Sequence, residues 1–139
     1  MTASARQPIV LDTNIVLDVF VFADSAAVPL KAALEAGSLD WLATRPMRDE
    51  LERVLAYPKI VQRLAFNKLK AEDVLAAFDQ HARLVAVAAK AGVTCSDADD
   101  QPFIDLAVAH QALLLSKDKA VTSMKKRLLA LEVRTQVAI

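Results

Sequence analysis

Four carboxylates occupy positions in the sequence where they could hold a metal ion. Asp12 directly follows the apolar run PIVL, and Asp118 directly follows ALLLSK. Asp100 ends the acidic run SDADD before an apolar segment, and Glu50 lies in RDELERVL. Carboxylate oxygens are the ligands that Mg²⁺ and Mn²⁺ prefer. Such ions neutralise a phosphodiester and activate water, so the pattern is typical of phosphodiester hydrolysis.

Each of these acids also has a purely structural interpretation. Asp is a favoured N-cap residue, and this role alone could explain Asp12 and Asp118. Glu50 could be a solvated helix residue paired with a nearby arginine. Asp97, Asp99 and Asp100 crowd into four positions, whereas capping needs only one or two acids. That excess of negative charge favours a bound cation there.

The overall charge excludes nucleic acid binding through a strong positive charge on the protein as a whole. The chain has 17 basic and 17 acidic residues and a formal net charge of zero. Contact with RNA must therefore come from a local basic patch or through a metal ion. The basic residues that flank the acids in sequence are predicted to contact RNA phosphates: Arg45, Arg48, Lys117 and Lys119.

The elements that must position the acids alternate between strands and helices. Short apolar runs predict strands over residues 8–11, 39–43, 112–115 and 133–139. Helical patterns cover 26–36, the stretch from Thr44 to Pro58, 59–70, 71–83, 102–111 and 119–130. Residues 13–24 could be strand or helix, and 84–93 fit neither pattern. This alternation predicts an α/β fold with a mostly parallel sheet between two helical layers. Ligands bind at the carboxyl ends of such strands, where Asp12 and Asp118 stand.

Composition limits the class of protein. A chain of 139 residues, 55% of them hydrophobic, suits a single domain over 1–139. The lone Cys95 excludes an internal disulfide and a cysteine-rich zinc site, so we expect a reducing cytoplasm. The N-terminal segment MTASARQPIVLDTN lacks the pattern of a signal peptide, and no apolar run reaches bilayer length. We expect no membrane association.

The ordered motifs resemble those of PIN domains. IVLDTNIVLDVF is similar to the opening strand and turn of that family, and RPMRDELERVL is similar to its second motif. SDADDQPFIDLAVAHQALLLSKDKAV resembles the third and fourth motifs, with the spacing between Asp100 and Asp118 that the family has. Each motif alone is weak, but the ordered set spans Ile9 to about Lys119 and is specific.

The resemblance assigns roles to individual residues. It implies that the metal-binding and catalytic acids are Asp12, Glu50, Asp100 and Asp118, with supporting groups Thr13, Asn14 and Ser116. Asp97 and Asp99 could join the metal shell, because the DxDD form resembles a subfamily of toxins from toxin–antitoxin pairs. Two positions depart from the family: Ser116 stands where Thr is commoner, and Lys117 stands where Gly is common in this subfamily.

The resemblance also implies an activity and partners. PIN domains have a three-layer α/β/α fold and usually cleave single-stranded RNA with Mg²⁺ or Mn²⁺. Bacterial members are often held inactive by a small antitoxin protein, and the family implies a homodimer. Two alternatives are a non-catalytic PIN-like module and a phosphatase of the haloacid-dehalogenase type. Such a phosphatase needs a second Asp two residues after its nucleophilic Asp, and this chain has Asn14 at that position.

Overall fold

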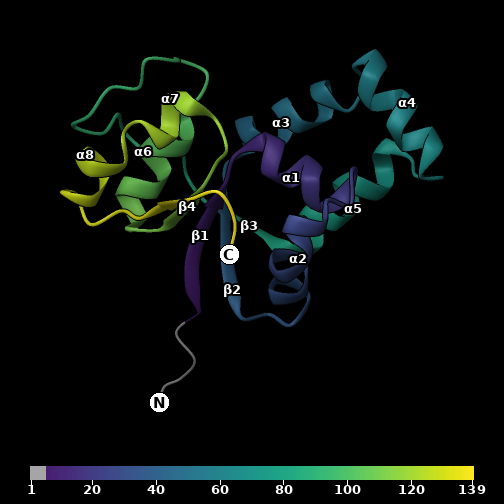
Figure 1. The fold of residues 1–139 in the computed structure, drawn as a ribbon, viewed down its shortest axis with the longest axis horizontal. Helices are drawn as coiled ribbons and strands as arrows, with labels where there is room; N and C mark the ends of the chain where they lie inside the picture. The colour runs from purple at the N-terminus through teal and green to yellow at the C-terminus, as the bar shows by residue number, and fades with distance from the viewer. Residues whose placement is uncertain (1–5) are drawn as a thin grey trace.

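The computed structural model describes residues 6–139 and is organised around one parallel sheet (Figure 1). Residues 1–5 belong to the N-terminal segment that lacks the pattern of a signal peptide, and they lie outside the described residues. The five strands follow the order β3-β2-β1-β4-β5, and every neighbouring pair is parallel. Their bounds are β1 Gln7–Leu11, β2 Leu39–Ala43, β3 Ala82–Leu84, β4 Leu113–Leu115 and β5 Thr135–Gln136.

The central strand is β1, and its burial explains its sequence. It pairs with β2 on one side and with β4 on the other, and Ile9 lies opposite both Trp41 and Leu113. Ile9 and Val10 are completely buried. A strand covered on both faces needs a continuous apolar run, and PIVL supplies it. The carboxyl ends of β1 and β4 therefore meet at one edge of the sheet, as predicted.

Helices cover both faces of the sheet. Helices α6, α7 and α8 lie on one side, and α1 to α5 lie on the other (Figure 1). The bounds are α1 Thr13–Phe20, α2 Val28–Glu35, α3 Arg45–Val54, α4 Pro58–Phe66, α5 Ala71–His81, α6 Gln101–His110, α7 Lys119–Thr122 and α8 Lys125–Leu129, with a 3₁₀ turn η1 at Ser25–Ala27. This arrangement confirms the predicted three-layer α/β/α architecture, and the sheet is fully parallel.

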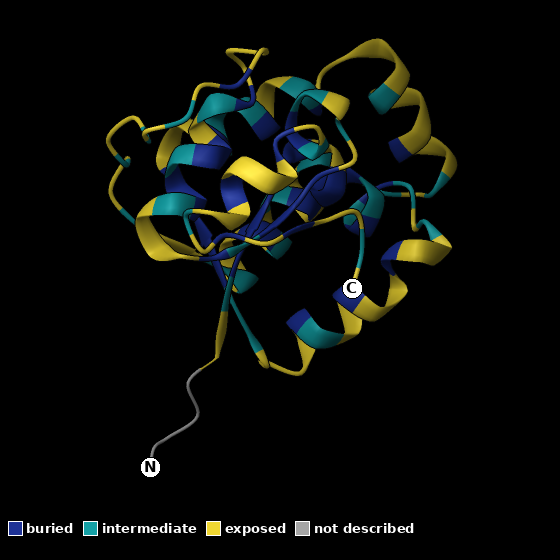
Figure 2. Cartoon of the chain, turned by 60° about the vertical axis from the view of Figure 1, so that its left-hand side comes forward, coloured by how far each residue is buried: buried dark blue, intermediate teal, exposed yellow. Residues whose placement is uncertain are grey.

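The core lies between the sheet and the two helical layers. Figure 2 shows the carboxyl-terminal parts of the central strands and the inner helix faces buried, with exposed residues on the outer faces of the helices. On the α1–α5 side the ring of Trp41 packs edge-on against Phe78, with 5.0 Å between centroids, and lies parallel to Phe20. On the other side, Ile104 and Leu106 of α6 are completely buried. No helix within residues 6–139 is long and apolar enough to cross a membrane.

The predicted helix over 71–83 was wrong at its end. Helix α5 stops at His81, and Ala82 turns into an extended conformation to pair with Trp41 of β2. Arg83 then donates two hydrogen bonds to the carboxylate of Asp40, at 3.1 and 2.8 Å. The resulting strand β3 was missed because Arg83 and Leu84 are exposed and give no apolar pattern.

Two other predicted helices were too long. The segment 119–130 forms α7 and α8 instead of one helix. The Ser123 hydroxyl donates to the Ala120 carbonyl, which a continuous helix would offer to Met124, and the Met124 N–H bonds to Val121 instead. Helix α4 ends at Phe66, before Lys68 adopts a positive φ of 57°. Residues 13–20, which fitted strand or helix, form α1.

Candidate metal centre

The ends of β1 and β4 bring Asp12 and Asp118 together through a serine. The Asp12 N–H donates to the Leu115 carbonyl at 3.1 Å, which extends the strand pairing up to the carboxylate. The completely buried Ser116 donates its hydroxyl to Asp12 Oδ2 at 2.7 Å and accepts from the Asp118 N–H at 3.1 Å. Ser116 thus ties the two acidic residues to each other.

Both of these acids are also helix caps. Asp12 Oδ1 accepts from the Asn14 N–H at 2.7 Å at the start of α1, and Asp118 Oδ1 accepts from the Ala120 N–H at 2.8 Å at the start of α7. Each cap uses one oxygen of its carboxylate. Among the described residues, Asp118 Oδ2 accepts no hydrogen bond. Capping and metal binding are therefore compatible at Asp118, because Oδ1 caps the helix and Oδ2 is left for a metal ion.

Asp100 occupies the start of α6 without capping it. Its side chain makes no capping hydrogen bond, it is only 8% exposed, and its Oδ2 is buried with no hydrogen-bond partner. Carboxylate oxygens of Asp97, Asp100 and Asp118 all lie within 4.8 Å of one another. A buried carboxylate oxygen without a donor is costly. A divalent cation held by these three groups would satisfy that oxygen, so the residues fit such an ion.

The electrostatics of the acids confirm how crowded they are. Burial raises the pKa of Asp100 to about 7, with further contributions from the charges of Asp118, Asp12 and Asp97. Burial also raises the pKa of Asp12, whereas its hydrogen bonds from Ser116 and Asn14 act in the opposite direction. A carboxylate whose pKa is raised by neighbouring like charges binds a proton or a cation to relieve the repulsion.

The other predicted acids lie around this group. Glu50, half-buried on α3, accepts a hydrogen bond of 2.6 Å from the Thr13 hydroxyl, so it reaches the start of α1 beside Asp12. Asp99 is exposed, and its N–H donates to Asp97 Oδ1 at 2.9 Å. Within residues 6–139, the tight group comprises Asp97, Asp100 and Asp118, and it does not include Asp12, Glu50 or Asp99.

Three of the four predicted phosphate-binding side chains already pair with acids. Arg48 binds Asp79 through two hydrogen bonds of 2.7 and 2.8 Å, and Arg45 binds Asp49 at 3.2 Å. Lys117 pairs with Asp18 of α1. No ion pair involving Lys119 occurs within the described part of the chain, and this residue is exposed beside Asp118.

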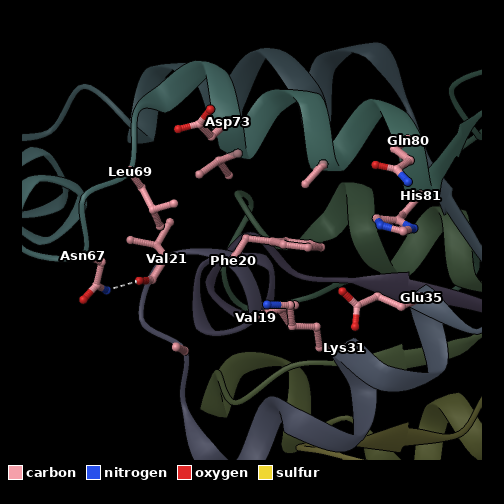
Figure 3. Close-up of a pocket in the computed structure, with 13 residues that line it drawn as sticks. Val19, Phe20, Val21, Lys31, Glu35, Asn67, Leu69, Asp73, Gln80 and His81 are labelled. Carbon is pink, nitrogen blue, oxygen red and sulfur yellow. Dashed lines mark hydrogen bonds between the residues drawn. The ribbon is translucent and has the colours of Figure 1, made fainter.

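A groove of substantial volume lies away from these acids. A groove of about 550 Å³ runs between the end of α1, helix α2 and helix α5 (Figure 3). Phe20 and Val21 line it, with His81 at one end and Lys31 and Glu35 along one wall. None of the predicted metal-binding acids lines this groove, so volume alone would have pointed to a different surface.

Two polar residues of α6 were missed as candidate site residues. Gln101 and Asp105 stand one turn apart on a helix that is otherwise apolar up to His110 at its end, and both make hydrogen bonds to the chain before Asp97. The signal in the sequence was this pair of polar residues at helical spacing in a buried segment.

The comparisons agree with the motifs. A family model described as PIN domain matches residues 8–120. No curated protein is similar enough to this chain to count as a match. The matched range covers β1 to the start of α7 and includes every acid described above.

Proposed function

Because the chain belongs to the PIN-domain family, whose members are typically metal-dependent nucleases, we propose that it is a Mg²⁺- or Mn²⁺-dependent endoribonuclease acting on single-stranded RNA. The observation that carries the proposal is Asp100, whose Oδ2 is buried with no hydrogen-bond partner and whose carboxylate lies close to those of Asp97 and Asp118. Buried polar groups are normally hydrogen-bonded, so a buried carboxylate oxygen without a donor needs an explanation. Binding of a metal ion by Asp100 would provide one.

The roles of the residues follow from their places. Asp97, Asp100 and Asp118 would hold the cation, with Asp12 behind them through Ser116. When bound, a divalent ion neutralises the phosphodiester, activates water and stabilises the leaving oxygen. In the proposed mechanism Glu50, whose carboxylate accepts a hydrogen bond from Thr13, would orient a water or bind a further ion. Asn14 is exposed beside Asp12 and is available to substrate.

Finer parts of the proposal rest on the resemblance of the motifs. The SDADDQPF segment resembles toxins of toxin–antitoxin pairs, so we propose that the chain is such a toxin, with an antitoxin protein and a second copy as partners and the cytoplasm as its location. Expression in a bacterial host should then arrest growth, and Asp118→Asn should remove the effect. Normal growth with well-expressed wild-type protein would refute the toxin role and leave the nuclease proposal standing.

The nuclease proposal is tested by cleavage of labelled oligonucleotides. Purified protein should cut single-stranded RNA with Mn²⁺ and stop in excess chelator, and double-stranded RNA and single-stranded DNA should be cut more slowly. Asp100→Asn and Asp118→Asn should both be inactive. A folded wild-type protein that binds RNA without cutting it in Mn²⁺ would favour the non-catalytic PIN-like module. The phosphatase alternative lacks its second Asp, because Asn14 occupies that position.

A further inference from the structure

The acidic segment before α6 belongs to no helix or strand, so something else must hold it in place. From residue 86 to residue 96, no backbone group pairs with another backbone group within the described chain. Yet Asp97, one of the three clustered acids, directly follows this stretch. A segment without backbone pairing is easily displaced unless side chains fix it.

The side chain of Gln101 supplies the missing bonds. Its Oε1 accepts from the Cys95 N–H at 2.6 Å, and its Nε2 donates to the Val93 carbonyl at 3.1 Å. Nε2 also donates to Asp105 Oδ1 at 2.7 Å, and the same oxygen accepts from the Ala91 N–H at 2.9 Å. Residues 91, 93 and 95 alternate along the chain, as on one edge of a strand. Two side chains of α6 therefore act as the partner of an extended segment.

The bond from Gln101 to Cys95 closes a tight turn around the acids. The closed turn runs from residue 95 to residue 101 and contains Asp97, Asp99 and Asp100. Three carboxylates within four positions repel one another, and that repulsion drives the turn open. Gln101 resists it with a neutral amide that uses both of its N–H groups and its oxygen. A carboxylate in its place could donate no hydrogen bond and would add charge beside Asp105.

We propose that Gln101, held in orientation by Asp105, is a positioning residue that keeps Asp97 and Asp100 in the arrangement a divalent cation requires. This inference rests on the proposed function, because it assumes that these acids bind a metal ion. In this role Gln101 acts through the backbone at Val93 and Cys95, and it is not itself a ligand of the cation. Asp105 acts as a hydrogen-bond acceptor, and its charge is not what the arrangement uses.

The test is Mn²⁺ binding by isothermal titration calorimetry on the full chain. Gln101→Ala and Gln101→Glu should weaken Mn²⁺ binding by about 10- to 100-fold, as is usual when the group orienting a ligand is lost. Asp105→Asn keeps the acceptor oxygen and should bind Mn²⁺ with the wild-type affinity. Asp105→Ala removes that oxygen and should bind Mn²⁺ more weakly than the wild type. Excess Mn²⁺ should restore most of the cleavage rate of Gln101→Ala, because the ligands themselves remain.

A matched control is available on the other side of the molecule. Asn67 donates its side-chain amide to the Val21 carbonyl at 2.6 Å, a bond of the same kind far from the acids in sequence (Figure 3). Asn67→Ala should lose stability but bind Mn²⁺ like the wild type. In a hydrogen-exchange experiment, the Cys95 amide should exchange faster in Gln101→Ala than in the wild type, and at the wild-type rate in Asn67→Ala.

The possible outcomes separate the two proposals. Wild-type affinity in a folded Gln101→Ala protein would overturn the positioning role while leaving the metal centre intact. A wild-type protein that binds no Mn²⁺ would overturn the metal centre and the positioning role together. If both Gln101 variants fail to fold, the Asp105→Ala and Asp105→Asn pair decides: equal affinities in the two proteins would overturn the inference.

Discussion

Neutralising Asp100 should stabilise the metal-free protein, although the residue lies at the start of a helix. The pKa of Asp100 is raised from 3.8 to about 7 in the folded chain. The folded protein therefore binds this proton more tightly than the unfolded chain does, and stability falls as the pH rises from 3.8 to about 7. Below this range, Asp and Asn at position 100 are both neutral and should behave alike.

The magnitude follows from the same shift. About 3 pH units at about 1.36 kcal/mol each correspond to about 4 kcal/mol of destabilisation above pH 7. The helix dipole of α6 favours the charge by about 0.3–1 kcal/mol and reduces the gain from removing it. Asp100 makes no capping bond, so Asn loses none. Solvent screens part of this repulsion, so we expect Asp100→Asn to be more stable by about 1–4 kcal/mol above pH 7.

The assay is urea unfolding followed by circular dichroism in excess chelator, at about pH 5 and about pH 8.5. The advantage of Asp100→Asn over the wild type should be smaller at the lower pH, which lies within the range between 3.8 and about 7, and larger at the higher pH, and added Mn²⁺ should stabilise the wild type alone. Asp24→Asn is the control, because Asp24 does not belong to the group of three acids and Asn caps η1 equally well. An Asp100→Asn protein that is less stable than the wild type at about pH 8.5 would refute the reasoning.

Three further predictions concern the same edge of the sheet. Mn²⁺ competes with the proton on Asp100, so Mn²⁺ affinity should fall by up to about tenfold per pH unit below about 7, measured by calorimetry; a flat profile would exclude Asp100 as a ligand. Ser116→Ala leaves buried Asp12 Oδ2 without its donor and should cost about 1–3 kcal/mol in urea unfolding, whereas Ser116→Thr should not; equal stabilities would remove the bridging role. Lys119→Ala should lower the slope of RNA affinity against salt by about one, and an unchanged slope would place Lys119 outside the RNA-binding surface.

The pattern of apolar runs predicted the architecture well because burial on both faces leaves a clear signal. PIVL and LDWLA became β1 and β2, and the acid after PIVL reached the edge of the sheet. Strand β3 gave no such signal, since Arg83 and Leu84 are exposed and the strand exists only through pairing with β2. Pairing between distant segments cannot be read from local periodicity.

The site was predictable in its acids and not in its contacts. Asp100 and Asp118 were identified from position and spacing, and the structure places them together. The hydrogen bond from Thr13 to Glu50 joins residues 37 apart, and the ion pair of Lys117 with Asp18 depends on how α1 lies beside β4. Such contacts follow from tertiary packing. The individual residues can be identified from the sequence, but the residues that they contact cannot.

The central claim is that Asp97, Asp100 and Asp118 hold a divalent cation, and anomalous diffraction from crystals soaked in Mn²⁺ tests it most directly. The account predicts one strong anomalous peak between these three carboxylates, at coordination distance from Asp100 Oδ2, and loss of that peak in Asp118→Asn crystals. A map without a peak there, at a Mn²⁺ concentration that supports RNA cleavage, would contradict the account.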